Sequence, residues 1–125
     1  MQSPPTASEL AILQLLWDNG PLTVRQVHDT VAEEREVGYT TTLKTMQVMF
    51  ERGFLTREPQ GRGHLYAAAI AKEDTQEKLL DNFLDRAFGG SVKGLVMRAL
   101  GSRKASRKDI QELKALIDRL ENEDQ

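Results

Sequence analysis

The sequence predicts a mainly helical protein with one small β-hairpin. Helix-capping patterns precede apolar residues at helical spacing, a glycine-rich turn separates two short β-prone segments, and the pattern after residue 71 is purely helical. With 125 residues, the chain has room for about one ordinary domain, or for a compact module with an extension. We therefore expect two domains, over residues 1–70 and 71–125.

Two capping boxes mark the first two helices. In this pattern a threonine hydroxyl accepts a hydrogen bond from the backbone amide three residues later. The Glu or Gln side chain of that later residue accepts a hydrogen bond from the threonine's own backbone amide. Thr6 with Glu9, and again Thr23 with Gln26, have this spacing. The first helix is expected to end before Pro21, and the second near residues 33 and 34.

A third helix and a hairpin complete the first domain. Apolar residues predict a helix from Thr40 to Arg52, which Gly53 ends. Two strands are expected over Phe54–Glu58 and His64–Ala69, joined by the five residues 59–63. The order helix, helix, helix, hairpin is that of a winged helix-turn-helix, whose third helix enters the major groove of DNA.

Three further helices are expected after residue 71. The fourth ends at the two glycines 89 and 90, Ser91 caps the fifth, and Ser106 with Asp109 opens the sixth. They carry more apolar surface than three short helices can cover, so we expect a helical dimerisation domain that a second copy completes. The candidate dimerisation residues are Leu79, Phe83, Val96, Ile110, Leu113, Ile117 and Leu120.

The third helix has one face suited to DNA. Thr42, Met46 and Met49 are predicted to face the core, which turns polar side chains outward. Such side chains can bond to base edges or phosphates, and an arginine between two glycines at the hairpin tip can reach the DNA backbone. Taken singly, each could also be ordinary helix or loop surface. The candidate DNA-binding residues are Tyr39, Thr40, Thr41, Lys44, Thr45, Gln47, Val48 and Arg62.

The net charge of −2 conceals an uneven distribution. Between Lys44 and Tyr66, four cations (Lys44, Arg52, Arg57 and Arg62) stand against two acids, whereas acids dominate after residue 109. A second basic run, Lys93, Arg98, Arg103, Lys104, Arg107 and Lys108, is typical of solvated surface, and we assign it no function.

The sequence offers little for catalysis, metal binding or membrane insertion. It has no cysteine, which excludes disulfides and thiolate metal sites. His28 and His64 belong to no metal motif, and no Gly-x-Ser-x-Gly is present. We expect no catalytic residue, metal or cofactor, and therefore no enzyme. The chain lacks an apolar run of the ~20 residues that span a bilayer and a secretory start, so a cytoplasmic protein is expected.

Several short motifs, in this order, resemble the penicillinase-repressor family of bacterial regulators, of the BlaI/MecI/CopY type. They are Leu16-Trp17, residues 20–27, Tyr39-Thr40-Thr41, Gly61-Arg62 with Tyr66, and residues 88–91. The resemblance runs from about Glu9 to Leu120. It implies a repressor that binds an inverted-repeat operator as a homodimer, with Tyr39, Thr40 and Thr41 at the start of the recognition helix and Gly61-Arg62 in the wing.

The chain departs from the family pattern at three positions. Thr42 replaces a small aliphatic residue, Val48 an arginine and Ala71 a serine. In the copper-responsive branch of the family, metal binding to a C-terminal cysteine cluster releases the DNA, which this chain cannot do because it has no cysteine. In the β-lactam branch a membrane sensor protease triggers cleavage of the dimerisation domain, and the corresponding stretch is Leu95–Gly101.

Two alternatives stay open on the sequence. The acidic balance and Val48 are compatible with a winged helix that binds a protein instead of DNA, which a gel shift with the promoter beside its own gene would test. A small hydrolase would need convergent polar groups that the motifs do not supply.

Overall fold

The computed structural model describes residues 3–102 and 105–123. The chain divides into two compact units, Met1–Leu79 and Leu80–Gln125, which we call the N-terminal unit and the C-terminal unit. The division falls within one helix, and the predicted domain boundary after residue 70 stays a prediction. Arg103 and Lys104 of the second basic run lie outside the described residues.

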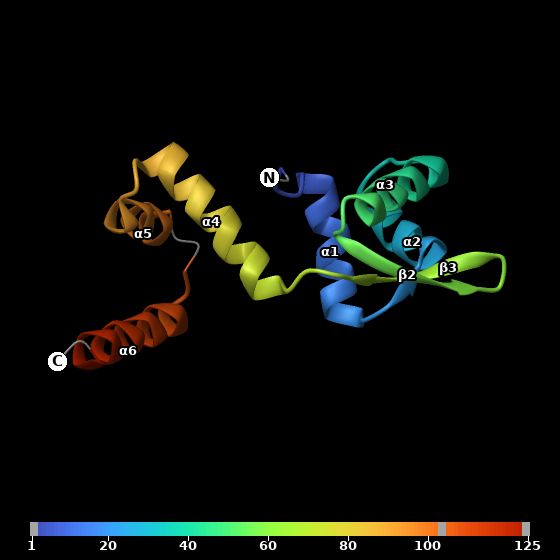
Figure 1. The fold of residues 1–125 in the computed structure, drawn as a ribbon. Helices are drawn as coiled ribbons and strands as arrows, with labels where there is room; N and C mark the ends of the chain where they lie inside the picture. The colour runs from blue at the N-terminus through green and yellow to red at the C-terminus, as the bar shows by residue number, and fades with distance from the viewer. Residues whose placement is uncertain (1–2, 103–104, 124–125) are drawn as a thin grey trace. The chain divides into compact units, whose positions relative to one another are not determined.

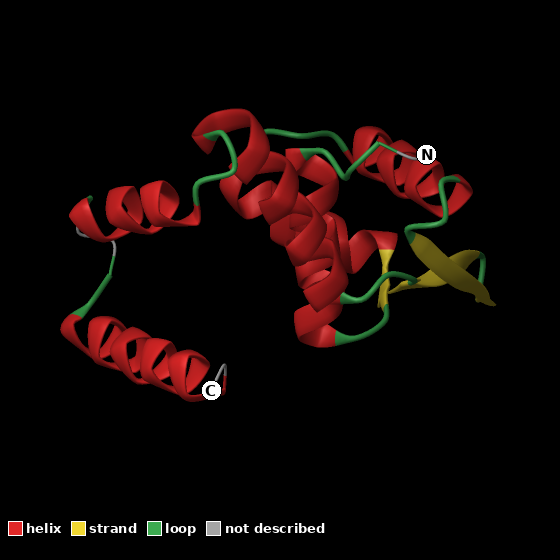
Figure 2. Ribbon diagram, turned by 60° about the vertical axis from the view of Figure 1, so that its left-hand side comes forward, coloured by secondary structure: helices red, strands yellow, loops and turns green. Residues whose placement is uncertain are grey.

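The helices and the hairpin follow one another in the predicted order, and one additional short strand completes a three-stranded sheet (Figures 1 and 2). The elements are α1 (Ala7–Asn19), β1 (Leu22–Thr23), α2 (Val24–Glu34), α3 (Tyr39–Glu51), β2 (Leu55–Gln60), β3 (Gly63–Ala68), α4 (Lys72–Phe88), α5 (Val92–Gly101) and α6 (Arg107–Glu123). The mainly helical fold class with a small β-hairpin is confirmed.

The capping predictions are confirmed at both boxes. The Thr6 hydroxyl accepts from the Glu9 amide at 3.2 Å, and the Glu9 carboxylate accepts from the Thr6 amide at 2.9 Å. Thr23 and Gln26 repeat the arrangement at the start of α2. The helix α3 begins one residue earlier than predicted, because the Gly38 carbonyl already accepts bonds from the amides of residues 41 and 42.

The hairpin differs from the prediction in length. The strands β2 and β3 pair through Gln60 and Gly63, so Gly61 and Arg62 alone form the connection, where five residues were expected. Pro59 lies within β2, which the sequence pattern treats as loop. The strand order is β1-β3-β2, so β2 is an edge strand, where a residue without an N–H is tolerated.

The core of the N-terminal unit lies between α1, α2, α3 and the sheet. Its buried apolar side chains come from all of these elements: Ile12, Leu13, Leu16, Val24, Val27, Met46, Met49, Phe54, Leu55 and Tyr66. Tyr66, which the family motif includes, is 1% exposed. Trp17 packs at the edge of this core and donates its indole N–H to the Ile70 carbonyl at 3.0 Å. This core fixes α3 against the other elements of the unit.

The helices of the C-terminal unit bury little of their apolar surface. Neither α5 nor α6 has a buried residue among those described. Of the seven predicted dimerisation residues, Leu79 is half-buried and the other six are exposed; Phe83, for example, is 53% exposed and Leu120 52%. Their role in dimerisation stays a prediction.

Candidate nucleic-acid interface

The helix α3 separates its core face from its outer face as the sequence predicts. Thr42, Met46 and Met49 are buried, at 3%, 0% and 0% exposure. The residues on the opposite side are exposed, apart from Thr45, which is half-buried. The apolar positions therefore tie α3 to the core and leave a mostly polar face outward.

Five of the eight predicted DNA-binding residues line one groove between the start of α1 and the outer face of α3. The groove has a volume of about 380 Å³. Thr40, Thr41, Lys44, Thr45 and Val48 line it from α3, and Thr6, Ser8 and Glu9 from the start of α1. Gln47 is exposed outside this groove, and Tyr39 and Arg62 lie elsewhere on the unit.

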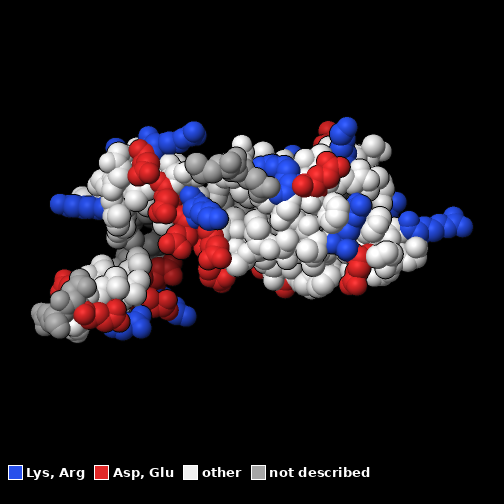
Figure 3. All heavy atoms as spheres, in the orientation of Figure 1, with Lys and Arg blue, Asp and Glu red and all other residues white. Residues whose placement is uncertain are grey.

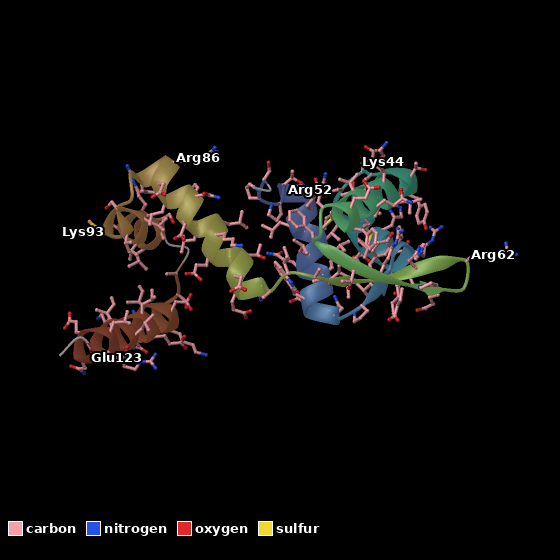
Figure 4. All side chains as sticks on the ribbon, in the orientation of Figure 1. Lys44, Arg52, Arg62, Arg86, Lys93 and Glu123 are labelled. Atoms are coloured by element: carbon pink, nitrogen blue, oxygen red, sulfur yellow. The ribbon has the colours of Figure 1, made fainter. Side chains whose placement is uncertain are left out.

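The groove is lined by threonine and serine hydroxyl groups, the Val48 side chain, the Lys44 ammonium and the Glu9 carboxylate, which is paired with Arg52. The Thr45 hydroxyl donates to the Thr41 carbonyl at 2.8 Å, which leaves its oxygen able to accept. Lys44 points away from the body of the unit (Figure 4). Among the described residues no carboxylate forms an ion pair with it. The exposed hydroxyl groups of α3 beside an unpaired ammonium match base edges flanked by phosphate.

The hairpin tip carries the second unpaired cation of the predicted set. Gly61 has a positive φ of 61°, a conformation that glycine adopts readily. Arg62, next to it, extends beyond the end of the hairpin (Figure 4). Within the described part of the chain, it too lacks an acidic partner. The wing thus presents a guanidinium to solvent.

Tyr39 is 36% exposed and makes two ring contacts that the sequence does not predict. Its ring lies under the Arg25 guanidinium, whose central carbon is 4.4 Å from the ring centroid. It also makes a T-shaped contact with the His28 ring, with ring centroids 5.5 Å apart at 82°. His28 in turn shares a hydrogen bond of 3.1 Å between its Nδ1 and the Thr42 hydroxyl. Sequence reasoning missed Arg25, since nothing in the order of residues places it beside Tyr39.

The helix α4 carries several acidic side chains. Figure 3 shows red side chains along α4, and a blue side chain at the tip of the hairpin. The acids of α4 include Glu73, Asp74 and Glu77. These acids contribute to the net charge of −2.

Metal sites and membrane spans are both absent from residues 3–102 and 105–123. No cluster of three or more histidine, aspartate or glutamate side chains there could hold a metal ion. No helix in the same ranges is long and apolar enough to cross a membrane.

Comparison with known proteins gives the family. The family model for the penicillinase repressor matches residues 5–119. The chain belongs to the penicillinase repressor family. The resemblance predicted from the motifs is confirmed, and this family member is a winged-helix, DNA-binding transcriptional repressor of the BlaI/MecI type and not an enzyme.

The relatives of this repressor are distant but match most of its length. The penicillinase repressor of Staphylococcus aureus is 19% identical over 110 residues, covering 88% of this chain and 87% of the relative. The penicillinase repressor of Bacillus licheniformis is 24% identical over 119 residues, covering 92% and 90%.

A solved structure shares the fold of this repressor. A mutant of MarR from E. coli, solved in complex with operator DNA, superposes with a TM-score of 0.53 at 12% identity, covering 92% of this chain and 74% of MarR. The winged-helix prediction is thereby confirmed. The eight candidate DNA contacts stay predictions.

Proposed function

We propose that this repressor binds an inverted-repeat operator as a homodimer, with α3 in the major groove and the hairpin as the wing. The observation that carries the proposal is the shared groove, where one face of α3 brings Thr40, Thr41, Lys44, Thr45 and Val48 together beside α1. Gln47 completes the exposed face, while Tyr39 and Arg62 flank it. Since its proposed target is operator DNA, we place the protein in the cytoplasm.

The proposed contacts divide into two kinds. Threonine and glutamine side chains read base edges, and the Val48 side chain, 37% exposed, can meet a thymine methyl group. Lys44 reaches guanine or phosphate, while Arg62 contacts the backbone and carries no sequence information.

A gel shift with the promoter DNA beside the repressor's own gene tests this assignment. Lys44→Ala and Thr41→Ala should each weaken binding of that promoter by about 1–3 kcal/mol, while binding to unrelated DNA changes less. Lys72→Ala, which removes an exposed lysine at the start of α4, is the matched control and should bind as the parent does.

Circular dichroism should show each variant folded, because all three side chains are exposed. Parental binding by both α3 variants would refute the assigned face. If the parent itself binds no promoter DNA, the alternative of a protein-binding winged helix gains instead.

The proposed dimer rests on the apolar surface of the C-terminal unit. Six apolar side chains of the candidate set are more than a third exposed, which is costly for a monomer in water. They are Phe83, Val96, Ile110, Leu113, Ile117 and Leu120. Two copies of this surface would cover each other in a two-fold dimer.

Sedimentation at micromolar concentration tests the dimer. The parent should sediment at twice the chain mass of 14.1 kDa, and Leu113→Asp should sediment as a monomer. That variant should also lose operator affinity by about 100-fold or more, because two linked binding events raise the effective concentration of the second. A parent that sediments as one 14.1 kDa species would exclude the dimer.

We further propose that proteolysis of the dimerisation domain releases the operator, through a membrane sensor protease. The stretch Leu95–Gly101 lies in α5, which has no buried residue among those described. A cut there would detach α6 and its share of the apolar surface. Mass spectrometry of the repressor from cells exposed to a β-lactam tests this: an intact chain after derepression would refute it.

A further inference from the structure

A continuous contact chain of four side chains joins the surface of α2 to the core through the start of α3. It runs from Arg25 to Tyr39, to His28, and to Thr42. The last of these is 3% exposed, whereas Arg25 is exposed. The inner end is thus anchored in the core, and the outer end holds a cation at the surface.

The cation at the outer end is available to a ligand. Among the described residues, no carboxylate forms an ion pair with Arg25. Its guanidinium lies over the Tyr39 ring, 4.4 Å from the centroid, where cation–π attraction limits its rotation. The five N–H groups of a guanidinium in such a position remain free to bind a planar or tetrahedral anion.

The position of this cation relative to α3 indicates which anion it meets. Tyr39 is the first residue of α3 and Arg25 is near the start of α2. In helix-turn-helix proteins the first helix of the pair crosses the DNA backbone, while the N-terminal residues of the recognition helix meet the bases. A guanidinium seated on Tyr39 therefore lies where the backbone would pass.

We propose that Arg25 binds a DNA backbone phosphate and that the Tyr39 ring, braced by His28 and Thr42, positions it. This inference rests on the proposed function, since it requires α3 to enter the groove. It adds a contact from α2 to the set on α3 and the wing. It also gives Tyr39 a second role, as a support for the guanidinium beside any bond made by its hydroxyl.

The test measures affinity against salt concentration, using the promoter duplex and an unrelated duplex as probes. Each phosphate neutralised by a cation adds about 0.9 to the slope of log K against log salt. Loss of one contact per subunit should thus make the slope of Arg25→Ala shallower by about 2 in a dimer. When salt is lowered from 200 mM to 50 mM, the ratio of the parent's affinity to that of Arg25→Ala should rise about tenfold on both duplexes.

Substitutions at Tyr39 separate positioning from direct contact. Tyr39→Phe keeps the ring and should keep the parental slope, because a lost neutral hydroxyl bond releases no counterion. Tyr39→Leu removes the support and should move the slope toward that of Arg25→Ala. Arg25→Lys retains the charge and should restore most of the slope. The double variant Arg25→Ala with Tyr39→Leu should lose no more slope than Arg25→Ala alone.

Each outcome has a separate meaning. A parental slope for Arg25→Ala, in a parent that does bind DNA, overturns this inference and leaves the proposed function standing. A parent that binds neither duplex overturns both. If Arg25→Ala flattens the slope but Tyr39→Leu, shown to be folded by circular dichroism, does not, the positioning role is overturned. Lys72→Ala is again the control and should keep the parental slope.

Discussion

The ion pair between Glu9 and Arg52 should be the most sensitive polar contact of the N-terminal unit. Arg52 Nη1 lies 3.0 Å from both carboxylate oxygens of Glu9, and the two side chains are 26% and 7% exposed. Glu9 also closes the capping box of α1 through the Thr6 amide. The second guanidinium nitrogen donates to the Ser3 carbonyl at 2.7 Å, and the group stacks on Phe54.

Replacement of Arg52 by methionine keeps most of the stem and removes the guanidinium. Loss of one partner of a buried pair costs about 3–5 kcal/mol, because the remaining charge stays out of water. Arg52 is a quarter exposed, so water can reach the site, and we expect a loss of about 2–4 kcal/mol in the free energy of unfolding. Glu9→Gln removes the buried charge itself and should cost less, about 1–2 kcal/mol.

Urea denaturation followed by circular dichroism, at one fixed protein concentration, measures these losses. The double variant Glu9→Gln with Arg52→Met should lose less free energy of unfolding than the sum of the two single losses. The difference, which is the coupling energy of the pair, should be about 1–3 kcal/mol. Arg25→Met is a matched control, since that guanidinium also lies on a ring, Tyr39, but is exposed. It should cost under about 1 kcal/mol. Additive losses for Glu9 and Arg52, within about 0.5 kcal/mol, would refute the reasoning.

Two further predictions concern the wing. Arg62→Ala should lower affinity for promoter and unrelated DNA alike and make the salt slope shallower by about one unit per subunit; a loss confined to one base-pair position would show instead that Arg62 reads a base. Gly61→Ala should destabilise the hairpin by about 1–2 kcal/mol in urea, because φ is +61° there although open space surrounds the position. Gly63→Ala, with open space and no positive φ, is its control and should cost clearly less.

The features that the sequence predicts well depend on neighbouring residues. A capping box is local chemistry, so Thr6 and Thr23 mark the starts of α1 and α2 directly. The core face of α3 follows from helical spacing, and Met46 and Met49 are buried as expected. For the same reason the outer face, with Lys44 on it, could be assigned before the structure.

The features that the sequence misses depend on residues far apart in the chain. The strand β1 has only two residues and exists because Leu22 and Thr23 pair with β3. Local alternation cannot reveal so short a strand. The hairpin is longer than expected because β2 is an edge strand and therefore accommodates Pro59. Whether a strand lies at the edge follows from the strand order of the folded sheet, which the local sequence does not give. The position of Arg25 over Tyr39 likewise requires α2 and α3 to be packed first.

The two units differ in how far the described side chains are covered within one chain. The outer face of α3 is fixed from within the N-terminal unit, by the bond between His28 and Thr42 near its start and by the pair of Glu9 and Arg52 just beyond its end. None of these contacts needs a second chain. The apolar side chains of α5 and α6 lack such cover in the described residues. Under the proposed function, disruption of the C-terminal unit would therefore leave the N-terminal unit folded. It would remove the linkage between the two N-terminal units of the dimer. The operator would then be released, because a single unlinked unit is expected to bind it more weakly.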